Sequence, residues 1–565
     1  MTMKRIFHIT LILSLFVSAC SLEENPEGYV TKENFYQTEE QCWSALRSLY
    51  TPLHYIYCKD FMVATEAATD LWYLSSSAND ATLMISPTNC GVASDVWKYA
   101  YKGISRANEC IECIEDAPIK LSAKQPMVAE ARAMRALYYY ILTSFMGDVP
   151  FYTESVSDVA TMDRIRKLPR TSAAEIRDSL YNDLKENALP YFTYENGYKC
   201  RANQVKNQHA GYALTLMVMA KMAMWNEQWS EALEALDLIE EVYGEFSEAT
   251  YPLEDIKWSR KLTDESIFEI QHAWDANGVK FYGEIAGVMT PKCSGDGVYD
   301  GVYMPRLAET GTNSTPMRAN KYYAVFRSAD NKQKENSANK KGIFSALPMW
   351  FTNETYATSD TTFRYYAVID MNALQSGINK NNKSIDRRAL LTLGIGNLET
   401  GEIFESLRKN SYFYGGPKFW CEGMTANYDS NNYRIFRYAD ALLMKAECLF
   451  RLNQQLQSVE YINIIRKRAF TNPTTGAVAP TYAESYETDE KLLALIKDER
   501  ARELGGEFHR KFDLVRWGDW YVKTSENNES KKLKANIRPC HCFYPIPETE
   551  CALSGGVLTN DAYNE

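Results

Sequence analysis

The sequence is poor in the residues and motifs that most enzyme families require. It contains only six histidines among 565 residues. The chain holds no HExxH zinc motif, no GxSxG nucleophile motif and no GxxxxGK(S/T) phosphate-binding loop. We therefore predict no catalytic residue, no metal site and no bound cofactor.

Long basic runs are missing as well, and the formal net charge is -11. An acidic surface repels nucleic acid and anionic lipid headgroups, so nucleic acid is not an expected partner. The composition is 45% hydrophobic and 24% charged. This balance is typical of a globular chain and argues against disorder over most of its length.

No stretch after residue 20 is long and apolar enough to cross a bilayer. At the start of the chain, Lys4 and Arg5 precede an apolar run from Ile6 to Ala19. That run is too short for a transmembrane helix, which needs about 20 residues to cross a hydrocarbon core of about 30 Å. We interpret residues 1–19 as a signal peptide.

The sequence Val17-Ser18-Ala19-Cys20 resembles the lipobox of bacterial lipoproteins. In that class the cysteine takes a diacylglycerol and, after cleavage, an acyl chain on its new amino terminus. Cys20 is therefore the predicted lipidation site, and each buried CH₂ would contribute about 0.8 kcal/mol to an anchor in outer-membrane lipid. Glu23 and Glu24 resemble the surface-export signal of Bacteroidetes lipoproteins, which implies the exterior face of the cell outer membrane. The alternative is an ordinary signal peptide that ends beside an accidental cysteine.

The other cysteines show no spacing that predicts a disulfide framework or a zinc site. Cys110 and Cys113 lie in a helical pattern, and Cys540-His541-Cys542 has no second ligand cluster at zinc spacing. Export would permit disulfides, but unpaired thiols are the interpretation that we favour.

Helical periodicity dominates the chain up to about residue 250 and again after about residue 430. Apolar residues recur at helical spacing over 31–57, 94–115, 122–145 and 169–187. Gly147 and Pro150 predict the end of the third of these helices. The segments 203–243 and 438–470 each predict a pair of helices with small residues on one face, which resembles a tetratricopeptide helix pair.

The amino-acid composition changes between residues 251 and 430. Gly, Asn, Asp, Ser and Thr become frequent there, and only 266–270 and 363–369 predict strands. We interpret 251–430 as a loop-rich insertion between an N-terminal helical part, 20–250, and a C-terminal helical part, 431–565. Loops held by a rigid scaffold are common places for binding sites.

Aromatic residues are abundant, with 38 Tyr and 11 Trp. Most belong in the core, but an aromatic ring in a polar loop can stack on a sugar. Burying roughly 50–100 Å² at about 25 cal/mol/Å² contributes on the order of 1–3 kcal/mol per ring. The candidate ligand-binding residues are Trp72 and Tyr73, with the polar Asn79 and Asp80 after them, and Tyr282, Tyr299 and Tyr303 in the insertion.

One charged stretch, 498–513, gathers carboxylates, arginines and His509, and such a set could do acid–base chemistry. Asp498 and Arg502 are four residues apart, a spacing that favours ion pairing on a helix surface. We therefore interpret the stretch as structural. Gly505 and Gly506 would weaken any helix that continued through them.

Five segments, in order along the chain, resemble the SusD/RagB family of nutrient-uptake lipoproteins. They are the lipobox with ENFYQTEEQCWSALRSLY, then DESIFEIQHAW, RIFRYADALLMKAECLF and YINIIRKRAF, and finally DERARELGGEFHRKFDLVRWGDW followed by YPIP at 544–547. The resemblance implies a mainly α fold. Tetratricopeptide-like helix pairs would form a right-handed superhelix that carries a large loop-rich insertion with short strands.

The same resemblance implies a non-enzymatic surface receptor. Such a protein binds an oligosaccharide, or in some members a peptide, and passes it to a SusC-like TonB-dependent β-barrel transporter. A surface-anchored glycan hydrolase or an adhesin would carry the same signal peptide and lipid anchor, so both stay alternatives. The insertion matches no part of the family that we can align, so the resemblance assigns no ligand-binding residues.

Overall fold

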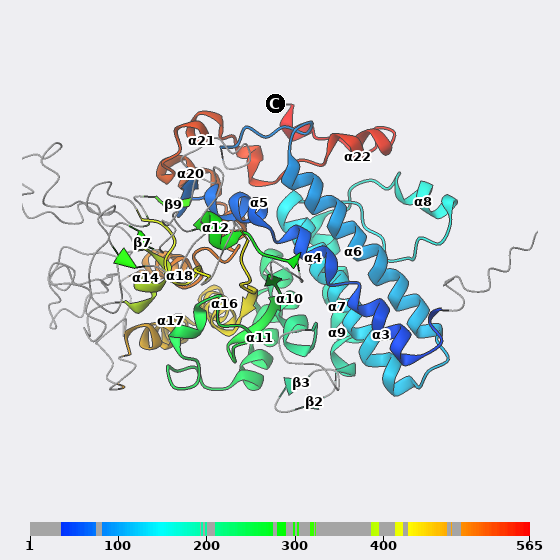
Figure 1. Cartoon of the computed structure of the whole chain (residues 1–565), viewed down its shortest axis with the longest axis horizontal. Coiled ribbons are helices and arrows are strands. Elements are labelled where there is room, and N and C mark those ends of the chain that lie inside the picture. Colours follow the sequence, from blue (N-terminus) through cyan, green and yellow to red (C-terminus); the bar gives the residue numbers. More distant parts are fainter. Residues whose placement is uncertain are drawn as a thin grey trace, which may run out of the picture.

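The computed structural model describes residues 35–74, 82–192, 209–274, 280–289, 317–320, 386–394, 413–421, 428–471 and 488–564, with residues 323 and 476. It also describes the backbone of short strands at 194–195, 198–199, 298–299 and 302–303. The described chain is mainly helical with few strands, which confirms the predicted fold class (Figure 1). No helix in this described portion is long and apolar enough to cross a membrane.

Eight helices form the scaffold by packing in succession: α6 on α7, α7 on α9, α9 on α10, α10 on α11 and α11 on α16, which also contacts α17 and α18. The predicted helix pairs are confirmed, because 203–243 contains α10 and α11, and 438–470 contains α16 and α17. The bounds are α6 Gly91–Asp116, α7 Leu121–Met146, α9 Ala173–Asn187, α10 Tyr212–Trp225, α11 Trp229–Tyr243, α16 Tyr438–Arg451, α17 Gln455–Phe470 and α18 Asp489–Leu504.

The ends of these helices follow local sequence signals. Helix α7 ends at Met146 because Gly147 adopts a φ of 74°, which favours glycine, so the predicted stop is confirmed. The continuous helix expected over 31–57 is wrong. Two helices occupy its described part, α3 (Glu39–Arg47), which a capping box of Thr38 and Gln41 opens, and α4 (Thr51–Ile56), with Pro52 in its first turn.

Shorter elements cover the scaffold. The helices are α5 Lys59–Met62, α8 Val159–Ile165, α12 Ile285–Met289, α14 Arg387–Thr392, α19 Arg510–Arg516, α20 Trp520–Asn527, α21 Lys531–Asn536 and α22 Glu548–Leu553. One π-helical turn, η1 Val63–Ala67, follows α5, and 3₁₀ turns lie at η2 Leu189–Tyr191, η3 Leu253–Ile256, η4 Pro539–Cys542 and η5 Asp561–Tyr563.

All five described sheets are two-stranded and antiparallel. The pairs are β1 Trp72–Leu74 with β9 Met317–Ala319, β2 Tyr194–Glu195 with β3 Tyr198–Lys199, β4 Ser266–Ile270 with β10 Tyr433–Arg437, β5 Ala273–Trp274 with β6 Lys280–Phe281, and β7 Val298–Tyr299 with β8 Val302–Tyr303. The predicted strand at 266–270 is β4. The strand predicted at 363–369 lies outside the described residues.

Strands β4 and β10 pair across about 160 residues of sequence and bring the beginning of the predicted insertion, 251–430, beside the chain that directly follows it. Both strands are buried along their whole length, yet both carry charged side chains. Arg434 of β10 contacts Glu269 of β4 at 3.2 Å. A buried charge is costly unless it is paired, so these ion pairs explain how a charged strand pair can lie in the interior.

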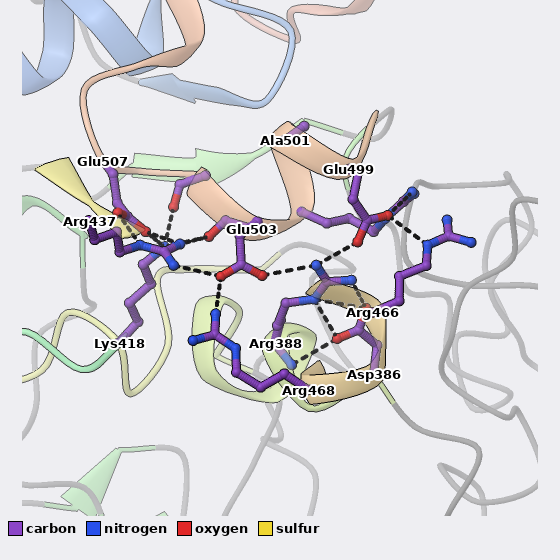
Figure 2. Close-up of polar contacts among 12 residues, drawn as sticks. Asp386, Arg388, Lys418, Arg437, Arg466, Arg468, Glu499, Ala501, Glu503 and Glu507 are labelled. Atoms are coloured by element: carbon purple, nitrogen blue, oxygen red, sulfur yellow. Dashed lines mark hydrogen bonds and ion pairs between the residues drawn. The ribbon is translucent and has the colours of Figure 1, made fainter. Parts of the chain in front are cut away.

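A larger network of buried ions surrounds Glu503 near the end of α18 (Figure 2). Its carboxylate accepts hydrogen bonds from Arg388 of α14 at 3.0 Å, Arg437 of β10 at 2.6 Å and Arg468 of α17. Burial alone would raise the pKa of Glu503, but these three arginines hold it well below its usual value. One carboxylate thus ties four separate elements together.

Neighbouring carboxylates on α18 and just after it extend this network. Glu499 pairs with Arg388 at 2.7 Å and with Arg466 at 2.9 Å. Glu507 pairs with Arg437 at 2.8 Å and with Lys418 at 2.5 Å. The structural interpretation of the charged stretch 498–513 therefore rests on a buried network with long-range partners.

The expected surface position of Arg502, by contrast, is wrong. Arg502 is buried and pairs with Glu499, three residues away, at 2.7 Å. Burial raises the pKa of Asp498, and the charge of Arg502 acts in the opposite direction. Arg510 is also buried and donates two hydrogen bonds to Asp70, at 2.8 and 2.7 Å. The spacing of charges along a helix did not reveal that its charged face is turned toward the interior.

Helix α18 ends at Leu504, directly before the two glycines. A Cβ at Gly505 would lie 2.4 Å from the hydroxyl oxygen of Tyr323, and one at Gly506 would lie 2.5 Å from the ring of Phe419. Gly506 also has a φ of 79°. The glycines therefore end the helix where the chain must pass close to two aromatic rings.

The described cysteines form no disulfide with one another, as favoured from the sequence. They are Cys42, Cys58, Cys90, Cys110, Cys113, Cys421, Cys448, Cys540, Cys542 and Cys551.

Substituting Glu503→Gln should leave buried arginines without their shared anion. We expect the free energy of unfolding to fall by about 3–5 kcal/mol, the cost typical of breaking a buried ion pair. Chemical denaturation followed by circular dichroism measures it. Glu526→Gln removes the same charge from an exposed position on α20 and should change stability by less than about 0.5 kcal/mol. Equal stability of the two variants would contradict the role given to Glu503.

Candidate functional site

A cleft of about 360 Å³ opens between α4, the start of α6 and the segment that follows β6. We call it the aromatic cleft, because half of its lining residues are Tyr or Phe. Its lining residues are His54, Tyr55, Tyr57, Cys58, Asp95, Tyr99, His272, Phe281, Tyr282, Gly283, Glu284 and Tyr433. The volume lies within the range typical of ligand sites, which is roughly 300–1,000 Å³.

Large aromatic rings of the cleft are exposed where a soluble protein usually hides them. Tyr55 is 51% exposed, Phe281 56% and Tyr282 38%. Tyr55 stacks in parallel on Tyr99, with ring centres 4.3 Å apart and an interplanar angle of 8°. The ring of Tyr282 lies 3.8 Å from that of Tyr428. Rings held by a neighbouring ring lose little entropy when they stack on a ligand, so these side chains form prepared platforms.

The segment that carries Tyr282 is fixed by backbone hydrogen bonds to the chain before β10. Gly283 and Asp429 exchange two N–H···O bonds, each of 2.8 Å. The hydroxyl oxygen of Tyr433 accepts hydrogen bonds from the N–H groups of Glu284, at 2.6 Å, and Ile285, at 3.1 Å. The segment can approach this closely only because Gly283 has no side chain, since a Cβ there would lie 2.2 Å from the Tyr433 oxygen.

A buried carboxyl group completes this attachment. Asp429 accepts hydrogen bonds from the N–H groups of Ala286, at 2.9 Å, and Asn431, at 3.0 Å. Burial raises the pKa of Asp429 to about 7, although those two hydrogen bonds act in the opposite direction. The wall of the cleft is therefore attached through specific polar contacts as well as through packing.

The polar groups of the cleft are suited to hydroxyl ligands. Burial raises the pKa of the Asp95 and Glu284 carboxyls, and the charge of nearby Asp60 raises both further. Burial lowers the pKa of His54, and it lowers that of His272 to about 3, so both imidazoles are neutral at neutral pH. Carboxylates and neutral imidazoles beside aromatic faces can bind the hydroxyl groups and the C–H faces of a sugar.

Of the residues predicted from the sequence, the structure places Tyr282 in the cleft. The placement of Trp72 in a polar loop is wrong: its side chain is fully buried, and its ring centre lies 5.6 Å from that of Tyr323. Tyr73 is half-buried in the same strand, β1, and does not line the cleft.

The remaining predicted residues cannot be placed at the cleft. The side chains of Tyr299 and Tyr303, in the β7–β8 pair, lie outside the described part of the structure. Asn79, Asp80 and the predicted lipidation site Cys20 also lie outside it.

Sequence reasoning missed Tyr55, Tyr99 and Phe281. It favoured aromatic residues in polar loops, whereas Tyr55 and Tyr99 lie on helices. A signal was nevertheless present in α4, because Tyr55 falls outside the stripe made by the buried Leu53 and Ile56. An aromatic residue off the apolar face of a helix is a candidate for ligand contact.

Substituting Gly283→Ala should displace the cleft wall, because the new Cβ would overlap the Tyr433 hydroxyl. We expect the free energy of unfolding to fall by about 1–3 kcal/mol, as for other overpacked sites. Gly91→Ala is the matched control, because nothing lies within 4 Å of a Cβ at this first residue of α6. Identical melting of Gly283→Ala and the parent protein would show that the segment is not held as described.

Comparison with known families identifies two regions of the chain. Residues 264–563, more than half of the chain, match the model described as the SusD family. Residues 32–219 match a model described as starch-binding associating with outer membrane. The two matches together cover most of the scaffold and the cleft.

Relatives extend over nearly the whole chain. A SusD-like protein, P25, of Formosa agariphila is 26% identical, and the match covers 99% of this chain and 98% of the relative. A SusD superfamily protein of Bacteroides vulgatus shares the fold with a TM-score of 0.62 at 19% identity, over 93% of this chain and 99% of that one. Surface glycan-binding protein A of Bacteroides thetaiotaomicron, solved in complex with laminarihexaose, gives a TM-score of 0.58 at 18% identity, over 92% and 98% of the two chains. The chain belongs to the SusD/RagB family.

Proposed function

We propose that this chain is a non-enzymatic, lipid-anchored protein of the outer-membrane surface that binds an oligosaccharide in the aromatic cleft. The observation that carries the proposal is the set of exposed rings of Tyr55, Phe281 and Tyr282 around a cleft that also presents Asp95 and Glu284. Aromatic faces with a few hydrogen-bonding groups are what recognition of a sugar ring requires.

The family supports the same ligand class. One structural relative was solved with laminarihexaose, and another is described as a laminarin-binding SusD-like protein. By analogy with the family, the bound glycan is passed to a SusC-like TonB-dependent β-barrel transporter. The residues of this chain's own cleft determine which glycan it prefers, so the ligands of these relatives are not assigned to it.

A glycan hydrolase remains the second candidate, because the cleft holds two carboxyl groups. Catalysis of this kind usually needs two carboxyls whose pKa values are driven apart. The pKa values of Asp95 and Glu284 are both raised, and both chiefly by burial. This similarity favours binding over hydrolysis. If the purified protein released reducing ends from a glycan, and Glu284→Gln abolished this activity, the protein would be a hydrolase and not a receptor.

Titration calorimetry with a panel of neutral oligosaccharides, and a peptide digest beside it, tests the ligand class. We expect saturable binding of one glycan class, and Tyr55→Ala should weaken it at least about fivefold, since a stacked ring contributes on the order of 1–3 kcal/mol. The melting temperature should stay unchanged, because Tyr55 is 51% exposed.

Tyr521→Ala is the matched control for that experiment, because Tyr521 is 40% exposed on α20 and does not line the cleft. It should leave the affinity unchanged. An equal loss of affinity in both variants, or saturable binding of the peptides alone, would contradict the proposal.

The anchor and the partner can be tested together in cells of the native host. The unmodified protein should label with fatty acid, fractionate with the outer membrane and co-purify with a β-barrel transporter in mild detergent. Cys20→Ala should lose the label, because the acylated sulfur is gone. Fatty-acid labelling that persists in Cys20→Ala would refute the anchor, and a protein that always purifies without a barrel would refute delivery to a transporter.

A further inference from the structure

A second cavity, of about 320 Å³, lies between the end of α7, the start of α9, the end of α10 and the C-terminal segment around η4 and η5. It shares no lining residue with the aromatic cleft. Its distinguishing feature is a pair of arginines, Arg170 and Arg177, which the proposed glycan cleft does not use.

Arg177 is a buried cation without a matching anion. It is 5% exposed, and it donates one hydrogen bond, from Nη2 to the carbonyl of Thr143, at 3.1 Å. Its guanidinium lies 4.5 Å from the ring centre of Trp225, and its Nε has no hydrogen-bond partner. Within the described residues it forms no ion pair, and burial lowers its pKa to about 10, although the charges of Asp148 and Asp178 act in the opposite direction. Buried charges are normally paired, so an anion is the group that this position lacks.

Arg170 lies at the rim of the same cavity. It donates hydrogen bonds to the carbonyl of Thr559 and, at 3.5 Å, to the side-chain oxygen of Asn560. In the part of the chain that is described, it also makes no ion pair with a carboxylate. Both arginines thus use neutral oxygens as partners and keep their full charge for a ligand.

The nearby carboxylates Asp148, Asp178 and Asp561 act on the two arginines through their charge, but among the described residues none of them forms an ion pair with either arginine. Asp148 accepts the N–H of Ala173 at 2.8 Å, and Asp561 accepts the Thr559 hydroxyl at 3.1 Å. Asp178, which also affects the pKa of Arg177, accepts the side-chain amides of Asn226 and Gln228 at 2.7 and 2.9 Å. Each acid is held by a neutral donor. These acids leave the arginines available, but they disfavour a ligand of high negative charge.

The wall of the cavity is aromatic. Trp225, Phe543 and Tyr563 line it, and the Tyr563 hydroxyl donates to the carbonyl of Phe543 at 2.7 Å, which fixes that ring. A carboxylate can accept two parallel hydrogen bonds from a guanidinium. The rest of such a ligand would lie against aromatic faces, as a sugar ring does.

We propose that this cavity is a second binding site, specific for a singly charged carboxylated sugar of the hexuronate class. The carboxylate would lie at Arg177 and Arg170, and the ring would lie against Trp225 and Tyr563. A single negative charge fits two arginines flanked by acids better than the double charge of inorganic sulfate or of a phosphate does, and the planar carboxylate matches the guanidinium fork. The site is independent of the aromatic cleft. One molecule could therefore bind a neutral oligosaccharide in the aromatic cleft and a uronate in this second cavity.

Titration of the purified protein with glucuronate and galacturonate tests this assignment, with glucose, galactose, sulfate and a short peptide carboxylate as comparison ligands. We expect saturable binding of a uronate and at least tenfold weaker binding of every comparison ligand, because charged hydrogen bonds are worth about 1.5–3 kcal/mol. Arg177→Met should abolish uronate binding. Arg170→Gln, at an exposed rim position that does not put folding at risk, should weaken it at least fivefold.

Arg166→Gln is the matched control, because Arg166 is an exposed arginine just after α8 that does not line the cavity. It should bind uronate like the parent protein. The proposal would be overturned if Arg170→Gln bound uronate as tightly as the parent protein. It would also be overturned if the parent protein bound glucose, sulfate or the peptide as tightly as uronate. Arg170→Gln should also leave oligosaccharide affinity in the aromatic cleft unchanged, so failure of one site is distinguishable from failure of the other.

Discussion

The pairing of Glu503 with three buried arginines is the interaction on which the arrangement of the molecule depends. Those arginines come from α14, α17 and β10, which lie far from α18 in sequence. Apolar packing would tolerate small shifts between such elements, whereas a buried ion pair is favourable only at close range and in the right geometry. The network therefore fixes how the insertion, 251–430, meets the helical scaffold.

That constraint reaches the aromatic cleft through a short chain of contacts. Arg437 at one end of β10 pairs with Glu503, and Tyr433 at the other end holds the backbone of Glu284 and Ile285. Tyr282 lies one residue before the close contact at Gly283. The charged interior and the ligand platform are thus joined by one five-residue strand.

Much of the scaffold was predictable because its signals are local. Helical periodicity placed α10, α11, α16 and α17, and Gly147 marked the end of α7. The ionic core was not predictable, since the partners of Glu503 lie 35 to 115 residues away in sequence. Trp72 precedes a polar stretch and resembled a loop residue. Its burial depends on β9, which begins 245 residues later. Tyr55 and Tyr99 were missed because only the assembled fold shows that two helical tyrosines stack in a cleft.

The proposed function depends on an oligosaccharide that binds against Tyr55, Phe281 and Tyr282. Hydrogen exchange followed by mass spectrometry, with and without a saturating glycan ligand, tests it most directly. We expect slower exchange in the peptides that contain α4 and residues 281–289, and unchanged exchange in α20 and α21. Protection confined to other segments, with α4 and 281–289 unaffected by a ligand that clearly binds, would contradict it.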